Sequence, residues 1–241
     1  MFKVLLPNTL LQYIQPNLTK TDVRRMSRIV KAILSMTGRV TMLGISRWAG
    51  KGGSYLTVPR FFSTVMPWPE LFDRFFEQHL YNPKGEYFLV GDESIITKSG
   101  KETHGLDYFF SRLLNKVVKS IGIFTLALVD VPERLSYPLR VEQVVRSEVE
   151  KAAAKARKKK KQAKKKTARK GKPGRPKGSK KRDKTQVELT EELKRIQKMV
   201  KKLLARLQNR IQVRHLALDG HFGNNNALQM VRPAPDLQAA L

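Results

Sequence analysis

The chain has 241 residues, a formal net charge of +28 and a pI near 10.5. Its length accommodates one sizeable domain and a smaller one, and 41% hydrophobic residues suffice for a buried core. The absence of cysteine excludes disulfides and thiolate metal sites, and no apolar run reaches the ~18 residues that a membrane-spanning helix needs. We therefore expect a cytoplasmic, nucleoid-associated protein with no membrane partner, whose charge attracts nucleic acid.

Residues 1–83 have the apolar periodicity of several short helices. The first well-defined helix is expected to begin at Thr21, a plausible N-cap. Segments 41–48 and 54–62 flank a Gly-rich break and have the order helix, turn, helix. That order suits a helix-turn-helix DNA-binding unit and an inert helical bundle equally well. Another helix is expected over residues 67–80, with its aromatic residues packed in a core.

Two short apolar runs, residues 86–96 and 213–223, carry Asp92 and Asp219 at the ends of what read as buried strands. If these strands pair in parallel, about 4.8 Å apart, the two carboxylates meet at one sheet edge. Since the four histidines are scattered, any metal must rest on carboxylate oxygen, which favours Mg²⁺ or Mn²⁺. Glu93 is expected on the opposite strand face. The alternative is that each aspartate only ends a strand or caps a turn.

Between and after these runs the pattern predicts further elements. A helix is expected over residues 108–114, and an antiparallel hairpin is expected from segments 120–129 and 136–145. A long amphipathic helix is expected to begin after Thr190 and to lead into the Asp219 strand, which a shorter helix follows. A meander of three strands, then a helical crossover into a strand parallel to the first, is the topology of the front part of a ribonuclease H-like fold.

Residues 151–184 contain 19 lysines or arginines and one acid, so this segment carries +18 of the net charge. It has no apolar stripe and is expected to be disordered or only locally helical when free. Within it, Lys172-Pro-Gly-Arg-Pro-Lys-Gly-Ser179 resembles an AT-hook for the A·T minor groove, although non-specific phosphate binding explains most of the segment. The basic residues expected to bind DNA are Arg157, Lys158, Lys159, Lys160, Lys164, Lys165, Lys166, Arg169, Lys172, Arg175, Lys177, Lys180, Lys181 and Arg182.

These shifts in composition divide the chain into five parts. They are a helical region over 1–83, the first part of a ribonuclease H-like core over 84–150, the basic insert over 151–184, the second part of the core over 185–231, and an aberrant, Pro-broken tail over 232–241. The expected fold class is α/β, with an N-terminal helical region followed by a partial ribonuclease H-like mixed sheet, flanking helices and a Lys-rich disordered insert.

Several of these stretches together resemble bacterial insertion-sequence transposases of the DDE type. They include Val90-Gly-Asp-Glu-Ser94, Leu218-Asp-Gly-His-Phe-Gly-Asn-Asn-Asn226, the predicted hairpin and the Lys-rich insert. The resemblance implies a ribonuclease H-like core with three acidic residues and two Mg²⁺ ions, in which Asp92 is the first catalytic acid and metal ligand and Asp219 the second. The family's third acid is a Glu on a late helix within a Tyr, Arg, Glu, Lys signature. This sequence has no such stretch, and after Asp219 its one acidic residue is Asp236.

The resemblance implies a transposase that cuts DNA at element ends and joins the 3′-hydroxyl to target DNA. Because the third carboxylate is missing, we expect a C-terminally truncated copy that is inactive alone and that pairs with itself or with a full-length relative. A truncated sheet is also expected to expose an edge and part of one apolar face. The alternative is a non-enzymatic remnant that binds DNA through the basic insert.

Overall fold

The computed structural model describes residues 18–50, 54–153, 155–156, 187–207, 210–231 and 238–240. The chain forms two compact units, Met1–Lys84 and Gly85–Leu241. Residues 151–153 and 155–156, at the start of the predicted insert, are helical. The rest of the insert, its AT-hook-like stretch and the predicted DNA-binding residues from Arg157 to Arg182 lie outside the described residues. Among the described helices, none is long and apolar enough to span a membrane.

The first unit consists of helices α2 (Lys20–Ser35), α3 (Met42–Trp48), α4 (Thr57–Phe62) and α5 (Trp68–His79). Helices α2, α3 and α4 share a core that includes Ile29, Ile45 and Phe61. The predicted cap at Thr21 is wrong, because α2 begins two residues earlier. The hydroxyl of Thr19 accepts a hydrogen bond from the main-chain N–H of Asp22 and donates one to the Asp22 carboxylate. This cap gives a partner to one of the free N–H groups in the first turn of the helix. The DNA-binding role of the α3–α4 pair stays a prediction.

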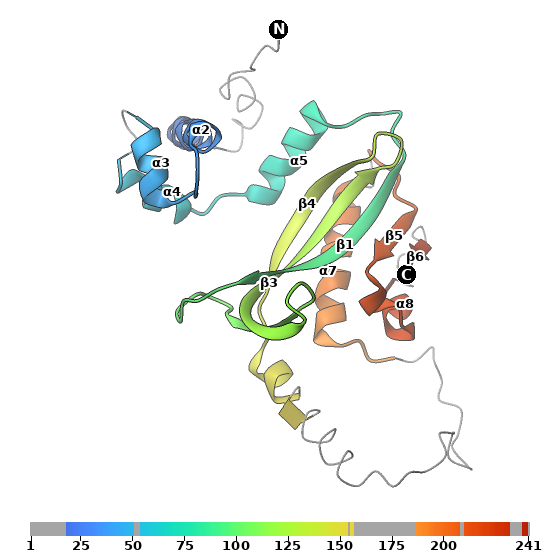
Figure 1. Cartoon of the computed structure of the whole chain (residues 1–241). Helices are drawn as coiled ribbons and strands as arrows, with labels where there is room; N and C mark the ends of the chain where they lie inside the picture. Colours follow the sequence, from blue (N-terminus) through green and yellow to red (C-terminus); the bar gives the residue numbers. More distant parts are fainter. Residues whose placement is uncertain are drawn as a thin grey trace, which may run out of the picture. The chain divides into compact units, whose positions relative to one another are not determined.

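The second unit is built on a six-stranded mixed sheet (Figure 1). Its strands are β1 (Tyr87–Thr97), β2 (Asp107–Ser111), β3 (Lys116–Asp130), β4 (Leu135–Val144), β5 (His215–Leu218) and β6 (Gln238–Ala240). The order is β2-β3-β1-β5-β6, and β4 also pairs with β3. β1 and β3 are antiparallel, whereas β1 and β5 are parallel. The predicted hairpin and the parallel pairing of the two Asp-bearing segments are therefore confirmed.

The helix predicted over residues 108–114 is wrong. This segment forms β2 and a tight turn into β3, with Phe109 opposite Val118 and Phe110 opposite Val117. Aromatic and β-branched residues favour such pairing, and Asn115, with φ of +47°, adopts the left-handed conformation that the turn requires. In the tail over 232–241, where the prolines predict no regular structure, residues Gln238–Ala240 form β6 and pair in parallel with β5.

The crossover into β5 is made by α7 (Glu191–Leu207), which begins after an N-cap at Thr190 as predicted. Its apolar stripe, with Leu203 fully buried, covers one face of the sheet (Figure 1). After β5 come a single 3₁₀ turn (Gly220–Phe222) and α8 (Asn225–Val231), which is tied to α7 by a hydrogen bond from Gln197 to the Met230 carbonyl. In the strand order, β5 lies beside β1, which is the central strand.

Candidate functional site

Asp92 and Asp219 occupy corresponding positions on two neighbouring strands. β1 and β5 run in parallel, and their register pairs Gly91 with Leu218. One further step along the same register sets Asp219, the residue directly after β5, opposite Asp92. Two residues that are far apart in the sequence are thus brought to one place in the sheet.

The alternation of side chains along each strand places Asp92 on the face that also carries Phe88. The ring of Phe88 lies 4.8 Å from the ring of His215, measured between centroids, so His215 belongs to the same face of β5. Asp219 follows His215 and Ala217 at the same two-residue interval. Asp92 is exposed and Asp219 is partly exposed, which leaves both carboxylates accessible to solvent.

The close approach of β5 to β1 at this point depends on Gly91, the residue before Asp92, whose Cβ position faces the opposite side of the sheet. A Cβ atom added to Gly91 would lie 2.6 Å from Leu218 Cδ2, 2.9 Å from Phe124 Cζ and 3.2 Å from Leu126 Cδ2. These are sub-van der Waals distances to well-packed side chains. Gly91 is therefore a packing requirement of the segment that positions Asp92.

Asp219 forms an ion pair with Arg112, whose Nη2 lies 2.6 Å from Asp219 Oδ2. Arg112 belongs to the turn between β2 and β3. Its hydrogen bond, together with main-chain N–H groups of His221 and Gly220, holds the pKa of Asp219 below the ordinary aspartate value. Sequence reasoning missed Arg112, because it lies in a segment that reads as helix and in no recognisable motif.

Glu93 points to the other face of β1, as predicted, and lies beneath α7. It lines a small cavity of about 20 Å³ with Glu142, Glu192 and Arg195, which is room for about one water molecule. Burial, followed by the charge of Glu192, raises the pKa of Glu93 above its ordinary value. Glu93 is thus separated by the sheet from the face that carries Asp92.

The two nearby histidines have other contacts. The main-chain carbonyl of His104 accepts a hydrogen bond from Gln143, and the ring of His221 packs against Phe222. Among the residues that the structure describes, no group of three or more His, Asp or Glu side chains could hold a metal ion. Asp236 lies outside the described residues, and Asp92 and Asp219 are the two carboxylates that the register of β1 and β5 sets opposite each other.

The sequence matches the family described as DDE superfamily endonuclease over residues 14–235. The match spans both the helical unit and the sheet unit, including Asp92 and Asp219. No curated protein and no solved structure matches the chain.

Proposed function

The chain belongs to the DDE superfamily endonuclease family, and on this premise we propose that it is a DNA transposase of the DDE type. In this function Asp92 and Asp219 hold divalent ions for phosphodiester cleavage and strand transfer. The observation that supports it most directly is the parallel register that sets Asp219 opposite Asp92. A crossover helix leading to a strand beside β1 also supports a ribonuclease H-like core, and the motifs quoted above favour a bacterial insertion-sequence origin.

The donor set fits a hard divalent cation. Mg²⁺ is commonly held in proteins by one or two carboxylates together with waters and substrate phosphates, and Asp92 and Asp219 supply two such carboxylates. A divalent ion held by Asp92 and Asp219 would supply Lewis-acid chemistry, which would activate the attacking water or 3′-hydroxyl and stabilise the leaving oxygen. The main-chain N–H groups of Gly220 and His221 orient the carboxylate of Asp219.

The third carboxylate implied by the resemblance is not supplied by the described residues. A two-carboxylate site retains metal affinity but stabilises the charge of the transition state less well than a three-carboxylate site. We therefore propose that the 241-residue chain binds a divalent ion and DNA, and that its own strand-transfer activity is weak. Pairing with itself or with a relative that supplies a third acid is the corresponding biological role.

A second candidate function is DNA binding without catalysis, through the basic insert. The charge of residues 151–184 favours it, because a +18 segment releases many counterions from DNA. The segments on either side of the insert are in contact with each other. Arg195 Nη1 lies 2.9 Å from Glu150 Oε2, so α7 and the segment that precedes the insert are held together at its base.

The test of the transposase function is a measurement of divalent-ion binding by the full chain, in which electron paramagnetic resonance detects bound Mn²⁺. Asp92→Asn and Asp219→Asn should each remove most Mn²⁺ binding, whereas Glu102→Gln, at an exposed loop position, should not. Weak Mg²⁺-dependent nicking of plasmid DNA should disappear in both aspartate variants. Equal Mn²⁺ binding by all four proteins would refute the metal site, and vigorous strand transfer by the unmodified chain would refute its weak activity.

A further inference from the structure

The hairpin formed by β2 and β3 presents an unusual outer face. Tyr108 lies opposite Lys119, and Phe110 lies opposite Val117, so strand alternation puts all four side chains on one face. Tyr108, Phe110 and Val117 are 62%, 51% and 55% exposed. We call these four residues the hairpin face. Two aromatic rings and a lysine are thus displayed to solvent on a regular β-ribbon.

The inner side of the same hairpin is firmly fixed. Phe109 is buried, and the guanidinium carbon of Arg146 lies 4.1 Å from the centre of its ring. Arg146 also donates to the main-chain carbonyl of Tyr108 and pairs with Asp107. The inner contacts therefore hold the hairpin in place, while the rings of Tyr108 and Phe110 remain free for an intermolecular role.

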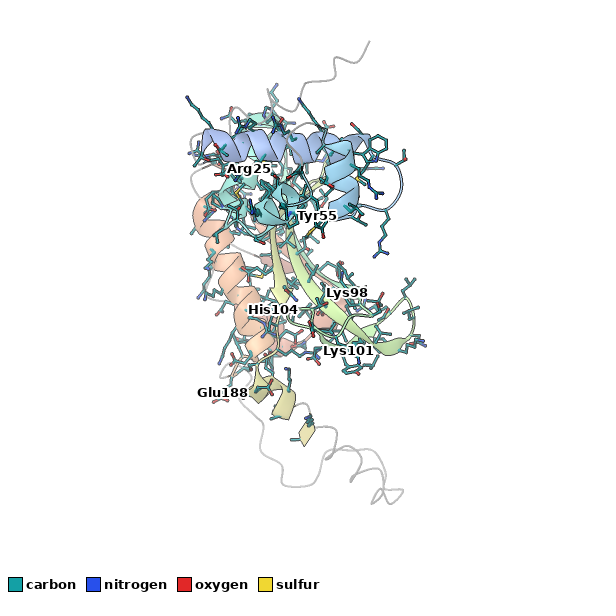
Figure 2. The ribbon with its side chains drawn as sticks, turned by 90° about the vertical axis from the view of Figure 1, so that its left-hand side faces the viewer. Arg25, Tyr55, Lys98, Lys101, His104 and Glu188 are labelled. Carbon is teal, nitrogen blue, oxygen red and sulfur yellow. The ribbon has the colours of Figure 1, made fainter. Side chains whose placement is uncertain are left out.

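The charge around the hairpin face is predominantly positive. Residues 98–119 contain five lysines or arginines and two acids, and one of these acids, Asp107, is already paired with Arg146. Within the described part of the chain, Lys98, Lys101, Lys116 and Lys119 make no ion pair. Figure 2 shows Lys98, Lys101 and His104 on the loop between β1 and β2. The surroundings are therefore suited to an anionic partner.

A groove of about 430 Å³ adjoins the hairpin face. Its lining includes Lys101, Tyr108, Lys119 and Lys151 together with two acids, Glu102 and Asp107, of which Asp107 is paired with Arg146. This size is within the range of sites for nucleotide-sized ligands. An aromatic ring and ammonium groups line the same hollow, so a base and its phosphate would find complementary groups there.

We propose that the hairpin face and this groove bind a single strand of DNA, with bases stacked on Tyr108 and Phe110 and phosphates beside Lys101 and Lys119. The tip of the hairpin touches the candidate site, because Arg112 in the turn contacts Asp219. The bound strand therefore leads toward Asp92 and Asp219, and this last step rests on the proposed transposase function. A second copy of the chain suits the surface poorly, since each copy carries a net charge of +28.

The first experiment is photocrosslinking of the full chain to a single-stranded oligonucleotide that contains 5-iododeoxyuridine, with the attachment sites mapped by mass spectrometry. EDTA keeps the experiment independent of metal binding, and 0.3 M salt, about twice the physiological ionic strength, weakens the contribution of the basic insert. Crosslinks are expected at Tyr108 or Phe110. Crosslinks confined to residues 151–184 would overturn the proposal.

The second experiment measures affinity for an oligothymidine under the same conditions. Tyr108→Leu keeps an apolar side chain but removes the stacking ring, and it should weaken binding by about fivefold or more. Val141→Ala, at an exposed apolar position of β4, is the matched control and should leave affinity unchanged. Equal affinities for all three proteins, or a dimer in sedimentation velocity that Tyr108→Leu dissociates, would refute strand binding. Hairpin crosslinks without Asp-dependent Mn²⁺ binding would refute the metal site alone.

Discussion

Arg112 and Asp219 form an ion pair with 2.6 Å between Nη2 and Oδ2, although they come from opposite ends of the sheet unit's sequence. A guanidinium thus lies against one of the two carboxylates proposed to hold a divalent ion. A metal ion and Arg112 compete for the same oxygen. We therefore expect Arg112→Gln to tighten Mn²⁺ binding by about two- to fivefold, as loss of a solvent-screened pair implies.

The control for this change is Arg134→Gln. Arg134 is also an exposed arginine in a hairpin turn of the same sheet, between β3 and β4, so its loss changes the net charge equally. It should leave Mn²⁺ affinity unaltered, and the gain from Arg112→Gln should vanish when Asp219→Asn is added. Weaker binding by Arg112→Gln would show that the arginine orders the site for the metal instead of competing with it.

The sequence alone predicts the pairing of β1 with β5, because each segment has a short apolar run followed by aspartate and a crossover helix lies between them. The prediction that Asp92 ends its strand is wrong, because β1 stays paired with β3 as far as Thr97. The sequence also predicts α7, whose apolar stripe follows a clear N-cap at Thr190. Both inferences rest on local patterns with well-known structural consequences. The candidate site could therefore be located from two local patterns and one rule of chain topology.

The β2–β3 hairpin could not be predicted in the same way. Tyr108, Phe109 and Phe110 are followed by Leu113 and Leu114, a spacing that resembles the stripe of a helix. The choice between helix and strand depends on β3, which offers Val117 and Val118 as partners. The contact of Arg112 with Asp219 is a consequence of this tertiary pairing, and no local pattern reports it.

The ion pair at the base of the insert should make stability depend on pH. Burial alone raises the pKa of Glu150, but the hydrogen bonds from Arg195 and Ser147 outweigh it and hold that pKa below the ordinary value of 4.5. A carboxyl whose folded-state pKa is lowered contributes stability above its unfolded pKa, and the contribution is lost as the pH falls through the folded value. Glu150→Gln should therefore be less stable than the unmodified protein at pH 7, by about 0.5 kcal/mol, and the difference should shrink progressively as the pH falls below 4.5.

Urea unfolding between pH 3 and pH 7 measures this difference. The side-chain oxygen of glutamine can still accept the capping hydrogen bond that the main-chain N–H of Ser147 donates, so the change isolates the charge. Glu148→Gln is the control, since Glu148 pairs with Lys151 in an exposed helical contact of a kind that contributes little, and it should show no measurable effect. A stability difference that persists unchanged at pH 3 would contradict a charge-dependent clamp.

Gly91 links packing to the candidate site. Gly91→Ala forces its new methyl group against Leu218, Phe124 and Leu126, and overpacking of this kind costs about 1–3 kcal/mol. We expect a lower free energy of unfolding. We also expect weaker Mn²⁺ binding, because the methyl group pushes β5 away from β1 and Asp219 moves with β5. Gly100→Ala meets its nearest neighbour at an ordinary 3.6 Å and should change neither quantity. Gly91→Ala with unaltered stability would mean that the core adjusts without moving β5.

The basic insert should dominate affinity for duplex DNA without supporting the fold. Replacing residues 157–186 by a Gly/Ser linker of equal length keeps the two flanking segments connected, and the pair between Glu150 and Arg195 still joins those segments. The melting temperature should stay within a few degrees, while duplex affinity at physiological salt falls by at least about tenfold and the slope of log affinity against log salt becomes shallower.

Arg175→Ala within the intact insert separates the two modes of binding, because it reduces a preference for A·T-rich duplex only if the AT-hook-like stretch enters the minor groove. If the linker variant had unchanged duplex affinity and an unchanged salt slope, the helical unit and not the insert would be the part that binds DNA.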